Sequence, residues 1–158
     1  MEDNSIYGTN DVSARCCKKT LTTIMNGNND LFVVSGGPIR IREIIGIVVT
    51  QIQAKSCTVN YNADPTSPAT DTAFGATAPG VDINGAAVGS LLTYNGTVAT
   101  DLTLTPNGVN VGQLYASSLI MPPGSIEFAA VVSTSATGAI DFYIRYEPLI
   151  AGAIVTPA

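Results

Sequence analysis

The feature that most constrains this chain is a period-two alternation of apolar residues between positions 121 and 149. Two rows share this spacing, separated by the polar STSATG turn: Ile126, Phe128, Ala130 and Val132, then Ile140, Phe142, Ile144 and Tyr146. Alternate residues of a β-strand point to opposite sides, so each row predicts a strand with one buried face. We expect the two strands to pair as a hairpin, bounded by the prolines at 122–123 and 148, which cannot donate to a ladder.

The polar face of that expected hairpin holds one pair of opposite charges. In a register that buries both apolar rows, Glu127 lies opposite or diagonal to Arg145, which predicts a cross-strand ion pair. An exposed pair of this kind contributes at most about 1 kcal/mol, so the register should depend mainly on the apolar rows.

The longest strand candidate spans residues 39–53, where the run IIGIVV is apolar on both faces. Its density of β-branched residues favours a strand over a helix, and Gly46 marks an expected bend or bulge. Such a strand lies centrally in a sandwich or buries its second face against another subunit. Arg40 and Arg42 share one face at its start, where we expect them to reach water or, alternatively, to bind a partner.

Turn signals divide the rest of the chain. Residues 20–25 and 30–35 flank an NGNN turn and predict a first hairpin, and Asn-Gly dipeptides recur at 84–85, 95–96 and 107–108. No other segment keeps the apolar spacing of an amphipathic helix. We therefore predict an all-β chain of eight or so strands, folded as an antiparallel β-sandwich that is jelly-roll-like. The domain should span residues 20–150, with a long surface loop at 63–79 and a C-terminal tail at 151–158.

Residues 1–19 carry no apolar period, which predicts an extended N-terminal arm. Three of the seven basic residues of the chain fall there: Arg15, Lys18 and Lys19. We expect them to anchor the arm on an acidic surface of a neighbouring chain. The alternative is a solvated lead-in to the first strand.

Charged residues are scarce, at 12% of the chain, against a usual share of about 25%. Monomers stay soluble mainly through charge, so a neutral surface indicates a protein that packs against copies of itself or a neighbour, although a neutral monomer remains the alternative. The net charge of −5 argues against a nucleic-acid partner. No apolar run suits a signal peptide or a membrane span, so we expect folding in a cytosol and no membrane partner.

The chain contains no histidine. This excludes Ser-His-Asp and Cys-His nucleophiles and histidine-ligated zinc sites. The three cysteines are Cys16, Cys17 and Cys57. Their spacing fits neither a CxxC metal pair nor a disulfide framework, so we expect reduced thiols.

Carboxylates offer two weaker signals. Paired acids can cleave glycosides, and four fall on strand candidates: Glu43, Glu127, Asp141 and Glu147. Outward strand positions explain each of them more simply. Asn26, Asn28 and Asp30 alternate like calcium ligands, but Leu31 stands where the calcium loop requires glycine. We expect no catalytic residue, no cofactor and no bound metal.

The end of the chain resembles a known group of proteins. The run PPGSIEF, the Ser/Thr/Gly turn, TGAIDFYIRYEPL and the tail GAIVTPA are similar to the C-terminal strands of small tailed-phage virion proteins. Those most resembled are the trimeric β-sandwich head-decoration (cement) proteins and related fibre-like appendages. The resemblance covers roughly the last third of the chain. It implies a homotrimer on the outside of a capsid, bound to the major capsid protein.

We accordingly expect a non-enzymatic virion structural protein, made in the host cytoplasm, that binds and stabilises a phage capsid. Linked weak contacts would raise its avidity, and bound protein must leave before capsid subunits separate. One alternative is a receptor- or glycan-binding module of a fibre or spike, which should expose Tyr61, Tyr94 and Tyr115 around a concave site. Another is a minor capsid protein that forms part of the shell.

Overall fold

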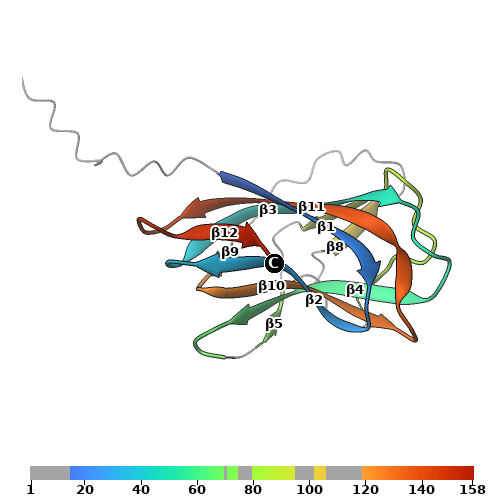
Figure 1. The fold of residues 1–158 in the computed structure, drawn as a ribbon, viewed down its shortest axis with the longest axis horizontal. Helices are drawn as coiled ribbons and strands as arrows, with labels where there is room; N and C mark the ends of the chain where they lie inside the picture. Colours follow the sequence, from blue (N-terminus) through green and yellow to red (C-terminus); the bar gives the residue numbers. More distant parts are fainter. Residues whose placement is uncertain (1–14, 70, 75–79, 95–101, 106–118) are drawn as a thin grey trace, which may run out of the picture.

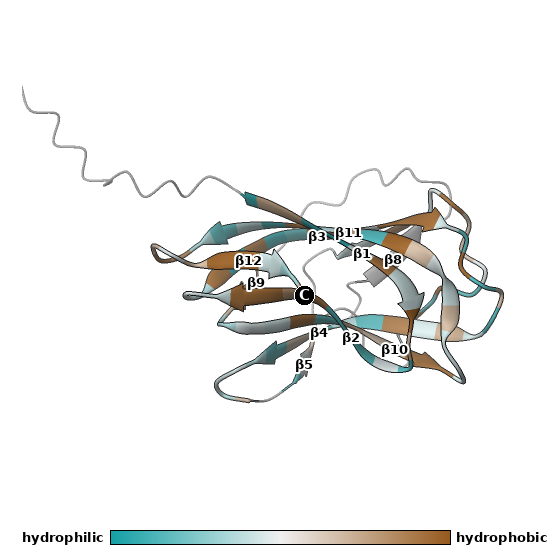
Figure 2. Ribbon diagram, viewed as in Figure 1, coloured by the Kyte–Doolittle hydropathy of each residue, from teal (hydrophilic) through white to brown (hydrophobic). Residues whose placement is uncertain are grey.

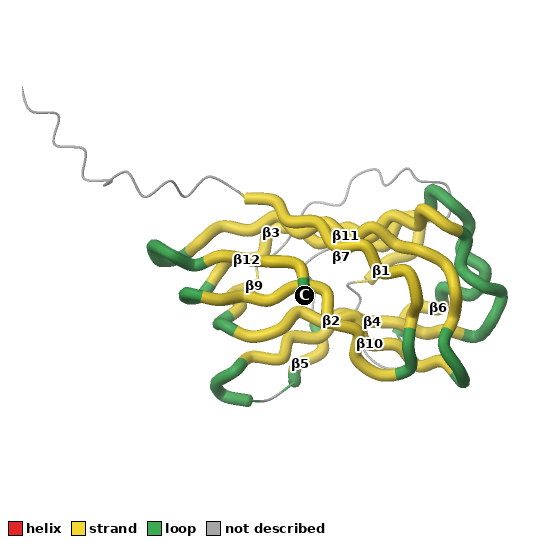
Figure 3. Tube along the Cα trace, in the orientation of Figure 1, coloured by secondary structure: helices red, strands yellow, loops and turns green. Residues whose placement is uncertain are grey.

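The computed structural model describes residues 15–69, 71–74, 80–94, 102–105 and 119–158. All regular elements in these residues are β-strands (Figure 3). The strands are β1 (Arg15–Ile24), β2 (Gly27–Ser35), β3 (Ile39–Thr50), β4 (Cys57–Pro65), β5 (Thr72–Ala73), β6 (Val81–Asp82), β7 (Leu91–Tyr94), β8 (Leu102–Thr105), β9 (Leu119–Met121), β10 (Gly124–Val132), β11 (Ala136–Pro148) and β12 (Ile154–Pro157).

The strands form two antiparallel sheets of six strands each. Sheet I has the order β1-β11-β3-β7-β8, with β9 also paired to β3; sheet II has the order β12-β2-β10-β4-β5, with β6 also paired to β4. In Figure 1, β3 and β11 lie in the upper layer of the view, and β10, β4 and β5 lie in the lower layer. The predicted all-β antiparallel sandwich is confirmed.

The strands pair in a nested order. β1 pairs with β11, β2 with β10, β3 with β9, and β4 with β5 and β6. β11 also pairs with β3, and β10 also pairs with β4. The early strands therefore pair with later strands in reverse order along the chain. Consecutive long strands alternate between the two sheets.

This order corrects both predicted hairpins. Strands β10 and β11 carry the two apolar rows expected from the sequence, and every residue of those rows is buried. However, β10 belongs to sheet II and β11 to sheet I, so the rows face each other across the core instead of lying side by side. β1 and β2 are separated in the same way. Period-two spacing identifies a buried face but does not distinguish a neighbouring strand from a facing one.

An aromatic cluster joins the two sheets. Phe128 of sheet II and Phe142 of sheet I lie 4.9 Å apart between ring centroids, and Tyr61 lies 5.8 Å from Phe128 and 6.2 Å from Phe142. Figure 2 shows hydrophobic residues on strands of both sheets. Rings packed from opposite layers bury large apolar areas, so this cluster contributes to the cohesion between the sheets.

The longest strand, β3, is central in sheet I, as one of the two predicted placements requires. Its ladder with β11 shifts register at Arg42, because Arg145 pairs with Glu43 and the next residue, Tyr146, pairs with Ile41. Gly46 pairs in register with Phe142. A Cβ at Gly46 would lie 2.9 Å from Cε1 of Phe142. The glycine therefore makes room for that ring, and the ladder is in register at Gly46, where a bend or bulge was predicted; the register shifts fall at Arg42 and between Val48 and Thr50 instead.

The sandwich extends beyond both predicted boundaries. β1 starts at Arg15, inside the expected arm, and β12 pairs with β2 inside the expected tail 151–158. The remainder of the expected arm, residues 1–14, lies outside the described residues, as do the Asn-Gly turns at 95–96 and 107–108. Part of the predicted surface loop 63–79 is also strand, since β4 continues to Pro65 and β5 covers Thr72–Ala73.

Candidate functional site: an acidic patch on sheet II

The two sheets differ in charge. Six of the seven basic residues lie on strands of sheet I: Arg15, Lys18, Lys19, Arg40, Arg42 and Arg145. The strands of sheet II contain no lysine or arginine and carry four carboxylates: Asp30, Asp64, Asp82 and Glu127. The described strands of sheet II therefore carry a net negative charge, whereas those of sheet I carry more basic residues than acids.

On sheet I the opposite charges are paired. Lys18 Nζ lies 2.6 Å from Asp141, and Arg145 lies 3.4 Å from Glu43. The hydrogen bond from Lys18 lowers the pKa of Asp141 below its usual value. Arg40 and Arg42 both reach Glu147: the distances are 3.5 Å and 2.7 Å. Each acid on the described strands of sheet I therefore lies in an ion pair with a basic residue of the same sheet.

These contacts correct the placement of the three predicted anchor residues on an extended arm, while their binding to a neighbouring chain stays a prediction. Arg15, Lys18 and Lys19 belong to the edge strand β1, which is paired along its length with β11. Lys18 is committed to Asp141, and Lys19 Nζ donates a hydrogen bond to the main-chain oxygen of Ala158. Two of the three expected anchor residues therefore hold the sandwich together at its edge.

The predicted pair between Glu127 and Arg145 is wrong. Glu127 lies on β10 in sheet II, whereas Arg145 lies on β11 in sheet I and bonds Glu43. Because β10 and β11 face each other across the core, their outward side chains point to opposite sides of the molecule. The prediction fails for the same reason as the hairpin that it assumed.

On sheet II, Glu127 is the centre of an acidic patch, which we define as Asp30, Asp64, Asp71 and Glu127. Asp30 on β2 is the register partner of Glu127. Asp64 on β4 is the partner of Ser125, two residues earlier on β10. Asp71 immediately precedes β5, and its charge acts on both Asp64 and Glu127. The three central strands of sheet II thereby bring together carboxylates that are far apart in the sequence.

Glu127 is an unusual member of this patch because it is 94% buried, with 6% of its surface exposed. Its Oε2 has no hydrogen-bond partner among the described residues. Burial raises the pKa of Glu127 to about 7, and the charges of Asp71, Asp30 and Asp64 act in the same direction, while a hydrogen bond with Asn28 partly opposes them. A buried carboxylate with one unsatisfied oxygen and three acidic neighbours is costly, so this residue is not explained by the stability of the isolated fold.

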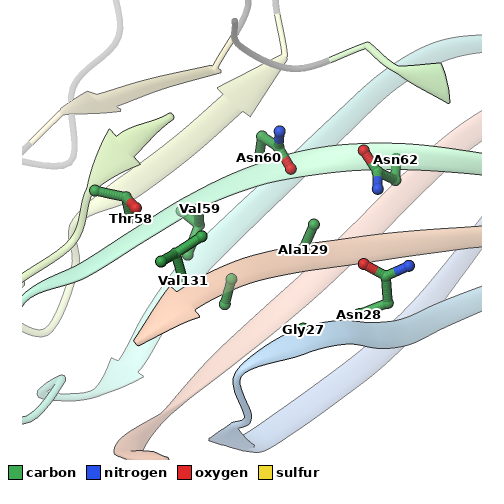
Figure 4. Close-up of a pocket in the computed structure, with 9 residues that line it drawn as sticks. Gly27, Asn28, Thr58, Val59, Asn60, Asn62, Ala129 and Val131 are labelled. Atoms are coloured by element: carbon green, nitrogen blue, oxygen red, sulfur yellow. The ribbon is translucent and has the colours of Figure 1, made fainter. Parts of the chain in front are cut away.

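A shallow groove of about 300 Å³ lies beside the acidic patch on the outer face of sheet II, with a lining that includes Asn62 and Ala129 but not Glu127 itself. Figure 4 shows Asn28 on β2, Ala129 on β10, and Asn60 and Asn62 on β4 around it. Asn62 is the register partner of Glu127, and Asn60 is the register partner of Ala129. The small side chain of Ala129 leaves the floor of the groove low between the flanking asparagines.

One hydrogen-bond acceptor in this groove and one beside it are unsatisfied. The Oδ1 atom of Asn60 is buried and, like Oε2 of Glu127, has no partner within the described part of the chain. An ionised carboxylate can only accept hydrogen bonds, and the side-chain oxygen of asparagine is also an acceptor. The groove and the acidic patch together are therefore suited to a ligand that carries positive charge and several N–H donors.

Other chemistries find less support in this region. Within the described ranges no three Asp, Glu, Cys or His side chains are grouped to hold a metal ion. Asn26, from the calcium-like pattern, accepts a hydrogen bond from the backbone N–H of Val132. Of the four carboxylates considered for glycoside cleavage, Glu43, Asp141 and Glu147 lie in ion pairs on sheet I, and Glu127 lies on the other sheet.

The expected aromatic binding site is also not formed by the described tyrosines. Tyr61 is completely buried in the aromatic cluster, and Tyr94 is 3% exposed and packs edge-on against Phe74. Tyr115 lies outside the described residues. The three cysteines are unpaired: Cys16 is exposed, Cys17 is half-buried and Cys57 is buried in the core.

Comparison with known proteins adds no assignment. A scan against protein-family models finds no match to the chain, and searches of the curated proteins and of the solved structures find none either. In the part of the chain that the structure describes, no helix is long and apolar enough to cross a bilayer. None of these comparisons tests the resemblance to phage virion proteins, which stays a prediction.

Proposed function

We propose that the protein is a non-enzymatic virion structural protein that binds and stabilises a phage capsid from outside, as a cement or decoration protein. The observation that carries this proposal is the nested strand order, in which β1 to β4 pair with strands met in reverse order from β11 to β5. Nested pairing over two facing sheets supports a jelly roll, an architecture frequent in viral capsid and lectin domains. Fold alone leaves many functions open, so the surface must add to the argument.

The surface supports attachment to other proteins. Charged residues form only 12% of the chain, and the unpaired negative charge is gathered on sheet II. Apolar side chains are also exposed on that side: Val33 on β2 is 37% exposed and Ile154 on β12 is 43% exposed. The sequence resemblance implies a homotrimer. A homotrimer would cover part of this apolar surface and would bind the capsid through several copies of each weak contact at once.

The alternatives draw less support from the described residues. A glycan-binding module would use exposed aromatic rings, and two of the three expected tyrosines are buried. Lectins also use jelly rolls, so binding of the purified protein to a glycan array would favour that reading. A minor capsid protein would be an integral part of the shell, and could not be removed and restored without dismantling it.

Phage particles made with and without the gene for this chain test the proposal. We expect mass spectrometry to find the protein in complete particles, and particles without it to assemble but to release DNA at lower temperature. Adding purified protein should restore both its occupancy and the release temperature, because bound protein must dissociate before the shell opens. Absence of the protein from purified particles, or failure of particles to assemble without it, would contradict a decoration role.

A further inference from the structure

We propose that the acidic patch and its groove on sheet II bind lysine or arginine side chains of a different protein, with Oε2 of Glu127 as the central acceptor. This inference deepens the proposed function, on which its biological meaning rests, because it states the chemistry of the partner surface. It can be tested on the purified chain, so its failure is separate from failure of the capsid role.

Glu127 supplies the first reason. It is the register neighbour of Asp30 on one side and of Asn62 on the other, so a donor that reaches its Oε2 also meets acceptors on both flanking strands. Glu127 as a residue is 94% buried, and its Oε2 is unpartnered among the described residues, although its side chain is hydrogen-bonded with Asn28. An incoming ammonium or guanidinium group would satisfy this oxygen and neutralise the repulsion from Asp30, Asp64 and Asp71.

The groove supplies the second reason. Its volume, about 300 Å³, is at the small end of ligand pockets and suits a side chain or short segment. Oδ1 of Asn60 is a further open acceptor along it. A guanidinium carries five N–H donors in one plane, so a single arginine can bond a carboxylate and an amide oxygen together.

A second copy of this chain is a poor source of the cation. Residues 1–14 contain Glu2, Asp3 and Asp11 but no lysine or arginine. Most basic side chains of the folded part already have partners within the chain: Lys18, Arg40, Arg42 and Arg145 are in ion pairs, and Lys19 and Lys55 donate hydrogen bonds. Binding to another copy would have to break these contacts, which favours a different protein with a basic surface.

The experiment uses ¹⁵N-labelled full-length protein and a hexa-arginine peptide at pH 8, where Glu127 is ionised. We expect saturable chemical-shift changes centred on the amides of β2, β10 and β4, which weaken as salt is added. Glu127→Gln should lower the affinity about tenfold, because it removes the charge that the bound cation contacts.

The matched control is Glu43→Gln, which removes the same charge from the outer face of sheet I. It should change the affinity less than about twofold, because Glu43 lies on the opposite sheet and only screened, long-range attraction is lost. Equal affinities for the Glu127→Gln variant and the unmodified protein would overturn the proposal. So would shifts centred on sheet I.

Two further probes separate other ligands. Calcium chloride and a neutral hexa-citrulline peptide, which keeps the size and hydrogen bonding of the arginine chain without its charge, should leave the β10 amides unshifted. Saturable shifts with calcium but not with hexa-arginine would indicate a divalent cation site instead. Saturable shifts with an oligosaccharide and none with hexa-arginine would indicate a glycan site, and each of these results would overturn the proposal.

Discussion

Replacing Phe142 with alanine is expected to lower the free energy of unfolding by about 4 kcal/mol. Phe142 is completely buried, and its ring contacts Phe128 and Tyr61 from the other sheet, at centroid distances of 4.9 Å and 6.2 Å. Truncation removes contacts between the layers and leaves a cavity that two hydrogen-bonded sheets cannot easily close. Urea unfolding followed by circular dichroism measures the loss.

Two variants control for this result. Tyr143→Ala changes the next residue of β11, which faces outward beside Lys18, and should cost about 1 kcal/mol or less. Gly46→Ala should destabilise the unmodified protein, because its Cβ would meet the ring of Phe142, and should cost less when combined with Phe142→Ala. Similar losses for Phe142→Ala and Tyr143→Ala would contradict the placement of Phe142 between the sheets.

Replacing Glu127 with glutamine is expected to stabilise the protein by about 2 kcal/mol above pH 7 and to change little below pH 4.5. The pKa of Glu127 is raised from 4.5 to about 7 in the folded protein, so the folded state holds its proton more tightly than the unfolded state does. Stability contributed by the protonated carboxyl is complete below pH 4.5 and is lost as the pH rises to 7. Glutamine resembles the protonated form and removes this loss.

Urea unfolding at a series of pH values measures the effect as the difference between the two proteins, because other titrating groups are common to both. Asp64, whose pKa is also raised, contributes with the same sign, and Asp141, whose pKa is lowered, contributes with the opposite sign. A difference that does not depend on pH, or a glutamine variant that is less stable at pH 8, would show that Glu127 has a satisfied partner. If the Glu127→Gln variant is more stable but binds hexa-arginine less well, then Glu127 serves binding at a cost in stability.

Much of the fold follows from residue spacing alone. The rows Ile126 to Val132 and Ile140 to Tyr146 are buried as predicted, because period-two alternation depends only on the pleat of a strand. The partners of those strands could not be predicted in this way. The turn at STSATG connects strands of the two facing sheets instead of two neighbours in one sheet. Which strands become neighbours depends on pairing between distant parts of the chain, such as that of β1 with β11.

The site was harder to predict than the fold. Asp30, Asp64, Asp71 and Glu127 are individually unremarkable outward positions, and only the order β2-β10-β4 brings them together. One signal was present in the sequence: the segments GNND, NYNAD and SIEF combine outward acids and asparagines with no basic residue. Without knowledge of which strands share a sheet, that pattern could not be separated from the balanced charges of β3 and β11.

A cryo-EM structure of phage particles made with the gene for this chain tests most directly whether sheet II is the face that meets a basic partner. We expect sheet II to face the capsid, with a lysine or arginine of a capsid subunit within hydrogen-bonding distance of Glu127. A structure in which sheet I faces the capsid, or in which Glu127 meets only water, would contradict this expectation.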